Sequence, residues 1–297
     1  MSDIDPDDAE IEASRAPLLD HLIELRQRLI VCVAAIIVGF LLCFNFSQQI
    51  YELLLHPFEV AAQIFAARKL GQGAGPFDLL LVLIGAKALP VVAGANLKFV
   101  FTAPLEFFFT KLKLAGFGAV VLTFPVLAWQ VYAFVAPGLY KRERRAFLPF
   151  LLAAPLLFMA GAALVYFMIL PFVLWFSLSQ QIIGAGAITV ELLPKVSDYL
   201  TLVTTLLLAF GLCFQLPVVL TLLGMAGLVS SQALAAGRRY AIVGVFVVAA
   251  VVTPPDPISQ TLLAIPIILL YEVSIWCVRA IERSRRGEDA GRQIVPV

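Results

Sequence analysis

The sequence has little charge for its length and few of the residues that enzymes use in catalysis. Only 14% of its 297 residues are charged and 61% are hydrophobic, against about 25% and about 45–50% in a soluble domain. It contains two histidines, and its four cysteines lie singly in apolar runs, so no cluster predicts a metal or disulfide. No Walker or H-E-x-x-H motif occurs. From these missing motifs and clusters we expect no enzyme and no cofactor. The net charge of +1 says nothing about nucleic acid, and we expect no nucleic-acid partner.

What the sequence has instead is long hydrophobic runs and a mean hydropathy of +0.97. A membrane-spanning helix needs about 20 apolar residues. The runs predict an all-α polytopic membrane protein with six transmembrane helices. The fifth helix has only 13 residues and would be about 20 Å long, which is shorter than a ~30 Å hydrocarbon core. The predicted helices cover about 29–46, 114–135, 147–176, 199–223, 240–252 and 258–278.

The distribution of basic residues predicts the orientation of these helices. Most arginines and lysines lie before the first helix, between helices two and three, between helices four and five, and after the sixth. By the positive-inside rule, both termini are cytoplasmic. The predicted organisation is a disordered acidic cytoplasmic tail over 1–17, a transmembrane domain over 18–280, an extracytoplasmic loop over 47–111 and a cytoplasmic tail over 281–297.

Two acidic residues stand out on the predicted cytoplasmic side. Glu24, in HLIELRQR, precedes Arg28 by four residues, which favours an ordinary ion pair on a helix surface. Glu143 is the only acid in GLYKRERR, and its neighbouring bases favour a local salt bridge. The alternative is that these carboxylates receive a guanidinium from a partner, which binds through two parallel hydrogen bonds.

Polar residues inside the hydrophobic runs form a second group. Gln215, in AFGLCFQLPVV, either satisfies backbone carbonyls freed by Pro217 or attracts a partner helix. Glu272 is expected near the cytoplasmic end of helix six, either solvated or paired with Arg279. Asp256, in the TPPDP turn, either caps helix six or marks the outer edge of the hairpin.

Two other classes of protein compete with a receptor or translocation role. A secondary transporter of small solutes would need a polar site near the membrane midplane and, commonly, internal repeats. No repeat is apparent, and most acidic candidates lie at the membrane surfaces. An intramembrane enzyme would need a nucleophile beside a base, and no such pair is visible.

Several long motifs, in order from about Pro17 to about Arg279, resemble the TatC family of the twin-arginine protein translocase. They include HLIELRQRL, TAPLEFFFTKLKL, QVYAFVAPGLYKRERR and VVTPPDPISQTLLAIP. The resemblance implies a cup-shaped bundle with short helices five and six, in the cytoplasmic membrane of a prokaryote. It also implies a receptor for twin-arginine signal peptides, which assembles with TatA- and TatB-type single-span subunits into an oligomeric complex. Export of folded proteins would be driven by the proton-motive force.

The resemblance also assigns roles to individual residues. Gln215 is a departure, because many members carry a glutamate there, and an amide cannot titrate. We expect the long 1–2 segment to exceed the usual family length. The resemblance assigns signal-peptide binding to Glu24, Arg26, Phe134, Glu143, Arg144 and Arg145; polar positions of the bundle to Gln130 and Gln215, beside Glu272; and the outer rim to Asp256, Gln260, Glu106 and Lys113. We expect Glu106 to brace this rim together with the nearby Lys113.

Overall fold

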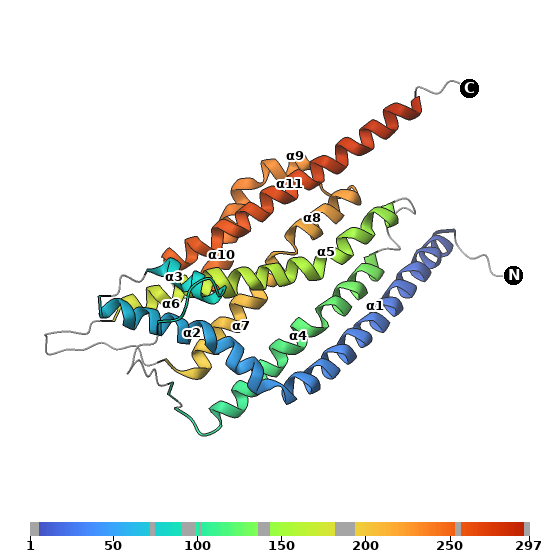
Figure 1. Ribbon diagram of the computed structural model, residues 1–297. Coiled ribbons are helices and arrows are strands. Elements are labelled where there is room, and N and C mark those ends of the chain that lie inside the picture. Colours follow the sequence, from blue (N-terminus) through green and yellow to red (C-terminus); the bar gives the residue numbers. More distant parts are fainter. Residues whose placement is uncertain are drawn as a thin grey trace.

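The chain forms a bundle of long helices, and the prediction of an all-α fold is confirmed (Figure 1). The computed structural model describes residues 6–71, 75–90, 99–100, 102–135, 143–181, 194–252 and 257–293. The helices α1 (Pro6–Asn45) and α11 (Pro257–Gln293) have their chain-terminal ends at the same end of the bundle. We call this the terminal end, and the other the distal end.

Five segments in the described part of the chain are long and apolar enough to cross a membrane. The helix α10 (Arg238–Val252) has 15 residues and falls short of that length. The six-span count therefore stays a prediction, whereas a multi-span helical protein is supported directly. The five segments are Leu22–Asn45, Glu106–Phe134, Leu152–Ser179, Val196–Met225 and Gln260–Arg283.

Two of these segments are interrupted next to a proline. Pro171 has no N–H for the fourth preceding carbonyl and its ring clashes there. The turn before it widens into a π-helix, Val165–Ile169, between α5 (Glu143–Leu164) and α6 (Leu170–Ser179). Pro217 similarly separates α7 (Val196–Cys213) from α8 (Leu216–Met225). The other three segments each lie in one continuous helix, namely α1, α4 (Glu106–Val135) and α11.

Helices extend into three regions that the sequence predicted otherwise. Residues 6–17, expected to be a disordered tail, belong to α1, and residues 281–293, expected to be a tail, belong to α11. Adding a residue to an existing helix costs far less than nucleating one, so the spans extend into polar sequence. The predicted loop 47–111 contains α2 (Ser47–Lys69), α3 (Pro76–Leu83) and the first turns of α4, and a short α9 (Ser231–Ala236) precedes α10.

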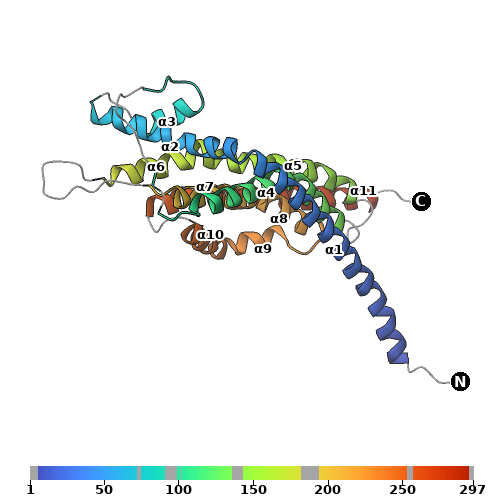
Figure 2. The same cartoon turned by 90° about the horizontal axis from the view of Figure 1, so that it is seen from below.

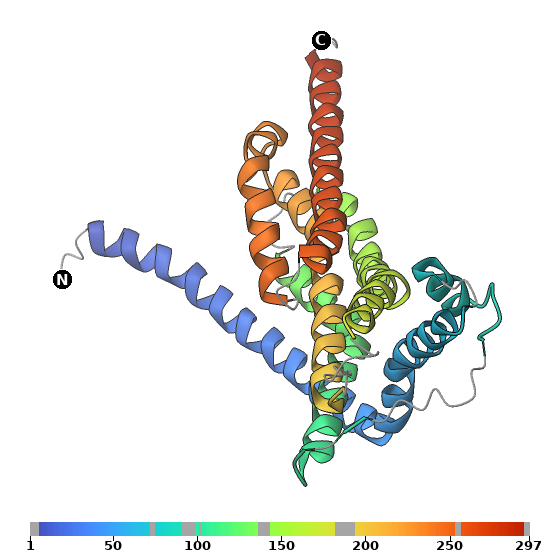
Figure 3. The ribbon, with the colours of Figure 1, turned by 90° about the vertical axis from the view of Figure 1, so that its left-hand side faces the viewer.

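The helix α1 stands apart from most of the bundle. α1 packs mainly on α4, while α10 packs on α11 and, to a lesser extent, α7. Seen from the distal side, α1 leans away from the other long helices, and α2 and α3 lie on the opposite side (Figure 3). The view from below shows the same separation of α1 from α2 and α3 (Figure 2). The bundle is thus widest toward the terminal end of α1.

Glycines mark the places where long helices approach most closely. A Cβ on Gly211 of α7 would lie 2.5 Å from the Phe158 ring of α5, and one on Gly161 of α5 would lie 2.7 Å from the Phe210 carbonyl oxygen. A Cβ on Gly39 of α1 would lie 2.8 Å from Thr123 of α4. In membrane proteins, small residues at helix crossings allow backbone contact, and van der Waals packing then holds the helices together.

The kinked helix α2 is tied to the bundle by two tyrosines. Pro57 cannot donate to the Leu53 carbonyl, and the Tyr166 hydroxyl donates to that oxygen at 2.9 Å. The Tyr199 hydroxyl donates to the Leu54 carbonyl at 2.8 Å. Tyr166 lies in the π-helix and Tyr199 in α7, so two separate elements fix the bend in α2.

Removing either hydroxyl should loosen α2 without breaking the bundle. We expect Tyr166→Phe and Tyr199→Phe each to lower the free energy of unfolding by about 1 kcal/mol, the usual value of one hydrogen bond. Hydrogen exchange of residues 50–60 should accelerate in both. Tyr51→Phe is the matched control, because its ring contacts Phe107 and its hydroxyl makes no hydrogen bond to any described residue. Equal protection in all three variants would contradict the assignment.

The helix α3 is held by a carboxylate whose charge matters. Asp78 accepts hydrogen bonds from Lys87 Nζ at 2.7 Å and from the Gly75 N–H at 2.9 Å. The bond from Lys87, followed by the bond from Gly75, holds the pKa of Asp78 below its usual value of 3.8. A carboxyl whose pKa is lowered by folding stabilises the fold above its unfolded pKa, and that contribution disappears as pH falls through the folded pKa.

The structure around α3 should therefore open in acid. We expect hydrogen exchange in residues 75–87, corrected for intrinsic rates, to increase as the pH is lowered from 5 to below 3.8, the usual pKa. Asp78→Asn should show the faster exchange already at pH 7 and little further acid dependence. If acid increased hydrogen exchange in Asp78→Asn as much as in the native chain, the increase would have to come from another titrating group.

Candidate functional site

The first part of the candidate site is a polar cluster that joins α1 to α4. Glu24 Oε1 accepts two hydrogen bonds from Arg28, from Nε at 3.1 Å and from Nη2 at 2.5 Å. Arg28 Nη1 also donates to Gln130 Oε1 at 3.4 Å. The predicted i,i+4 ion pair is confirmed. Gln130 is brought to it by the packing of α1 on α4, which sequence spacing could not show.

The other residues assigned to signal-peptide binding are less completely placed. Arg26 is exposed on α1, two residues from both Glu24 and Arg28. Phe134 is half-buried near the end of α4. Glu143 is the first residue of α5, and Arg144 and Arg145 continue its first turn. Their side chains lie outside the described part of the structure. The geometry thus places Glu24 with Gln130 and leaves Glu143 positioned by its backbone alone.

The polar side chain of Gln215 lies at the break between α7 and α8. Its Nε2 donates to the Ala154 carbonyl of α5 at 2.9 Å and contacts the Gly211 carbonyl at 3.5 Å. The first of these bonds crosses to another helix, and the second goes back to the broken helix itself. Both are backbone partners, as the simpler interpretation of the sequence predicted. Gln215 therefore ties α5 to the α7–α8 break.

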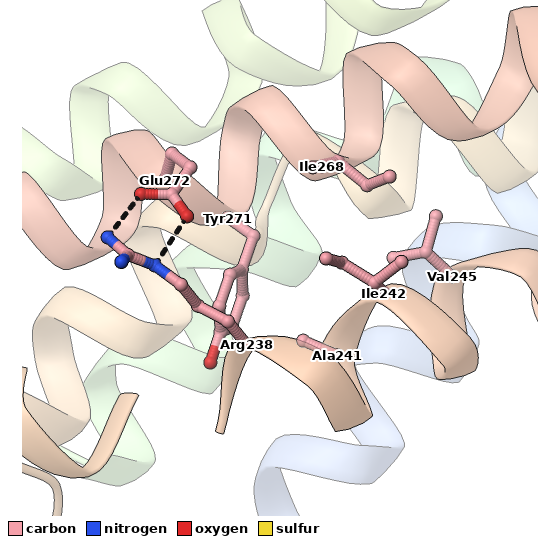
Figure 4. A pocket seen from close by; sticks show the side chains of 7 residues that line it. All are labelled: Arg238, Ala241, Ile242, Val245, Ile268, Tyr271 and Glu272. Atoms are coloured by element: carbon pink, nitrogen blue, oxygen red, sulfur yellow. Dashed lines mark hydrogen bonds and ion pairs between the residues drawn. The ribbon is translucent and has the colours of Figure 1, made fainter. Parts of the chain in front are cut away.

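Glu272 was expected to be solvated or to pair with Arg279, and the structure pairs it with Arg238 instead. Arg238 Nε lies 2.7 Å from Glu272 Oε1 and Nη2 lies 2.8 Å from Oε2, a two-point guanidinium–carboxylate pair (Figure 4). Beside it, a small cavity of about 10 Å³ is lined by Tyr271 and apolar residues of α10 and α11. Arg238 is the first residue of α10, so this short helix begins beside the middle of the Gln260–Arg283 segment.

At the distal end, α10 and α11 are joined by an amide. Gln260 Nε2 donates to the Phe246 carbonyl of α10 at 3.1 Å. Asp256, predicted to mark the same rim, lies outside the described residues. The α10–α11 hairpin is thus held by a polar contact near each end, Gln260 at one and Arg238–Glu272 at the other.

Glu106 organises the distal end of the bundle, but through partners that differ from the predicted Lys113. Its Oε1 accepts from Ser197 Oγ at 2.7 Å and its Oε2 accepts from the Thr102 N–H at 2.9 Å. Lys195 Nζ lies 3.7 Å from Oε2. Lys113 is exposed and lines a small cavity beside Ser197. The sequence carries no local signal for a pair separated by about 90 positions, and spacing favoured the nearer lysine.

No group of three or more potential metal ligands occurs within the described ranges. The polar residues of the candidate site instead form small groups, each of which joins two helices. These can bind a charged peptide group or fix helix positions, and none has the nucleophile–base geometry of a hydrolase.

Comparison with known proteins gives a consistent match over most of the chain. Residues 20–266 match the family model of the Sec-independent protein translocase protein TatC. The TatC protein of Magnetococcus marinus is 43% identical, over 94% of this chain and 90% of that protein. The TatC protein of Escherichia coli is 36% identical, over 89% and 88% of the two chains.

A solved structure has the same arrangement of helices. The crystal structure of a twin arginine translocase receptor, TatC, has a TM-score of 0.66 and 32% identity, covering 88% of this chain and 98% of that one. The family, the relatives and the fold all agree with the motifs in the sequence. The chain therefore belongs to the TatC family of Sec-independent protein translocase proteins, which are non-enzymatic components of protein transport.

Proposed function

We propose that this chain is the receptor subunit of a twin-arginine translocase and binds the paired arginines of signal peptides at the terminal end of the bundle. The observation that carries the proposal is the geometry at Glu24, whose Oε1 already binds a guanidinium through two nitrogens. Within the described structure, Oε2 accepts no hydrogen bond. An incoming arginine can use Oε2 or replace Arg28, since both give the same charge-assisted contact.

The second acid in the proposal is Glu143. It begins α5, and the basic residues around it would weaken the binding of a cationic peptide unless a second acid offset them. The proposed topology puts Glu24 and Glu143 on the same membrane face, where the negative charge of Glu24 would offset these bases. Arg26, Arg144, Arg145 and Phe134 then border the site and shape it.

The proposed topology places both termini in the cytoplasm of a prokaryotic cell, with the chain in the cytoplasmic membrane. Two observations support it: the terminal ends of α1 and α11 lie together (Figure 1), and basic residues concentrate in the segments of that end. α10 would be the sixth span. The side of the bundle on which α1 leans away from the other long helices would form the concave side of the cup.

We assign TatA- and TatB-type subunits to the lipid-facing surface around the short α10. Large apolar side chains are exposed along this helix, and Val251 at its distal end is 82% exposed. A short span thins the bilayer beside it, which suits the approach of single-span helices. The energy for export would come from the proton-motive force, because the chain carries no nucleotide-binding motif.

Binding of a twin-arginine signal peptide to the purified protein in lipid tests the receptor role. Replacing Glu24 or Glu143 with glutamine should weaken binding about tenfold or more, because a hydrogen bond to a charged group contributes about 1.5–3 kcal/mol. A twin-lysine peptide should bind more weakly to the native chain, since lysine cannot form the two-point contact. The measurement is a titration followed by fluorescence anisotropy.

Glu52→Gln is the matched control, because Glu52 is an exposed acid on α2, near the distal end of α1, and its only hydrogen-bond partner among the described residues is Gln48. Its variant should bind the peptide as the native chain does. Unchanged binding in both the Glu24 and the Glu143 variants, with normal thermal unfolding, would remove the receptor site from this surface.

A further inference from the structure

A cavity with two arginines lies between α9 and α11 at the terminal end. Its volume is about 260 Å³, and it is lined by Ser231, Gln232, Arg279, Glu282 and Arg283. The last three belong to the final turn of the Gln260–Arg283 apolar segment, the depth at which a spanning helix leaves the hydrocarbon. The residues that line it do not include Glu24 or Gln130, the described polar residues of the proposed signal-peptide site.

The charges around this cavity favour an anion. Glu282 is already engaged, since its Oε1 accepts the Ser231 N–H at 2.8 Å and its Oε2 accepts Ser231 Oγ at 2.5 Å. These bonds fix the start of α9 against α11 and so shape one wall. Arg279 and Arg283 are four residues apart and share a helix face. In the described part of the chain, neither guanidinium has a hydrogen-bond or ion-pair partner.

An apolar track on α11 leads toward the two arginines. Leu269 is 60% exposed and Trp276 is 70% exposed. At 100° per residue, both fall within about 60° of Arg283 around the helix axis. Trp276 stands one turn before Arg279, the position that amphipathic aromatic rings favour at a membrane interface. Ile265 and Val273 extend the same exposed track.

We propose that the cavity binds the phosphate of an anionic membrane lipid, and that the acyl chains of this lipid lie along the track from Trp276 to Ile265. Guanidinium groups bind phosphate oxygens through two parallel bonds. Basic pockets between helices at a membrane surface are suited to lipid headgroups. Gln232 adds an amide donor on the facing wall. A free phosphate shares the headgroup chemistry but makes no use of the apolar track.

Native mass spectrometry of the purified full-length chain can measure this binding. Phosphatidylglycerol and phosphatidylcholine with the same acyl chains are added to the native chain and to Arg279→Gln, Arg283→Gln and the double variant. Near an anionic lipid, each arginine contributes about a fivefold change in affinity. We expect phosphatidylglycerol to bind about fivefold more weakly to either single variant and about 30-fold more weakly to the double variant. Phosphatidylcholine should bind weakly to all.

Arg239→Gln is the matched control, because Arg239 is exposed on α10, lies over the Tyr240 ring and does not line the cavity. It should retain native affinity. Unchanged phosphatidylglycerol binding in the double variant, or equal binding of both lipids to the native chain, would overturn the proposal. Thermal unfolding of each variant verifies the fold.

Two further measurements distinguish a bound lipid from a soluble phosphate ion. Inorganic phosphate at millimolar concentration should compete poorly, and Trp276→Ala should weaken the lipid without affecting phosphate. If phosphate displaces the lipid as effectively as phosphatidylglycerol itself does, the ligand is a soluble anion and the lipid assignment fails. None of these measurements uses a signal peptide, so their outcome is independent of the receptor test.

Discussion

Replacing Gly211 with leucine should leave little folded protein in the membrane. The first added carbon would stand 2.5 Å from the Phe158 ring, well inside van der Waals contact. Phe158 is almost fully buried and stacks on Phe124 of α4 at 4.1 Å between ring centroids. The ring therefore cannot turn aside, and α5 and α7 must separate. We expect a loss above about 4 kcal/mol, a large part of the ~5–15 kcal/mol of a typical fold.

The yield of monodisperse protein after detergent extraction, together with its thermal unfolding midpoint, measures this effect. Gly244→Leu is the matched control, because a Cβ at Gly244 of α10 meets no atom within 4 Å. That variant should be extracted and should melt as the native chain does. Gly211→Ala should fall between the two. A native unfolding midpoint for Gly211→Leu would show that α5 and α7 can repack without the glycine contact.

The second large effect is expected from lengthening α10. Its 15 residues reach about 22 Å, less than a ~30 Å hydrocarbon core. Duplicating four apolar residues after Val247 brings the helix to about 28 Å and rotates its last turn by only about 40°. If the short helix thins the bilayer for partner subunits, export of a twin-arginine substrate should fall to background. Signal-peptide binding should remain, because the terminal end is unchanged.

Export is measured as periplasmic accumulation of a folded reporter in cells that lack their own TatC protein. Val247→Leu combined with Val251→Leu is the control, because both substitutions keep the exposed partner-facing surface of α10 apolar and leave the length of the helix unchanged. This variant should export normally. Normal export by the lengthened chain would show that the length of α10 has no part in transport.

The parts of the fold set by local sequence were predictable, and the parts set by long-range contacts were not. Apolar runs located the long helices, and i,i+4 spacing predicted the Glu24–Arg28 pair. The helix α2 was missed because polar and apolar residues alternate too closely in it to resemble a span, and α3 was missed because its eight residues are too few to cross a membrane. Tyr166 fixes α2 from 113 positions away, which no local pattern shows.

In the candidate site, too, local sequence identified single residues, and their long-range partners could not be predicted. Motifs pointed to Glu24, Gln130 and Gln215 individually, but spacing could not show that Arg28 bridges Glu24 and Gln130. For Glu106 and Glu272, the sequence offered a nearby base in each case, and the fold supplied Lys195 and Arg238 instead. A carboxylate takes the partner that helix packing brings to it, and that partner is distant in sequence whenever two helices meet.

The π-helix Val165–Ile169 is equivalent to a single-residue insertion within one long helix. Deleting one residue there would restore regular winding and turn everything after it by about 100°. The α6 face that carries Trp175, whose ring packs on Phe65 of α2, would then no longer meet α2. Among relatives, gain or loss of this residue would therefore change which outer helices the bundle can hold. A single residue in the middle of a span thus determines whether helices outside that span can pack on it.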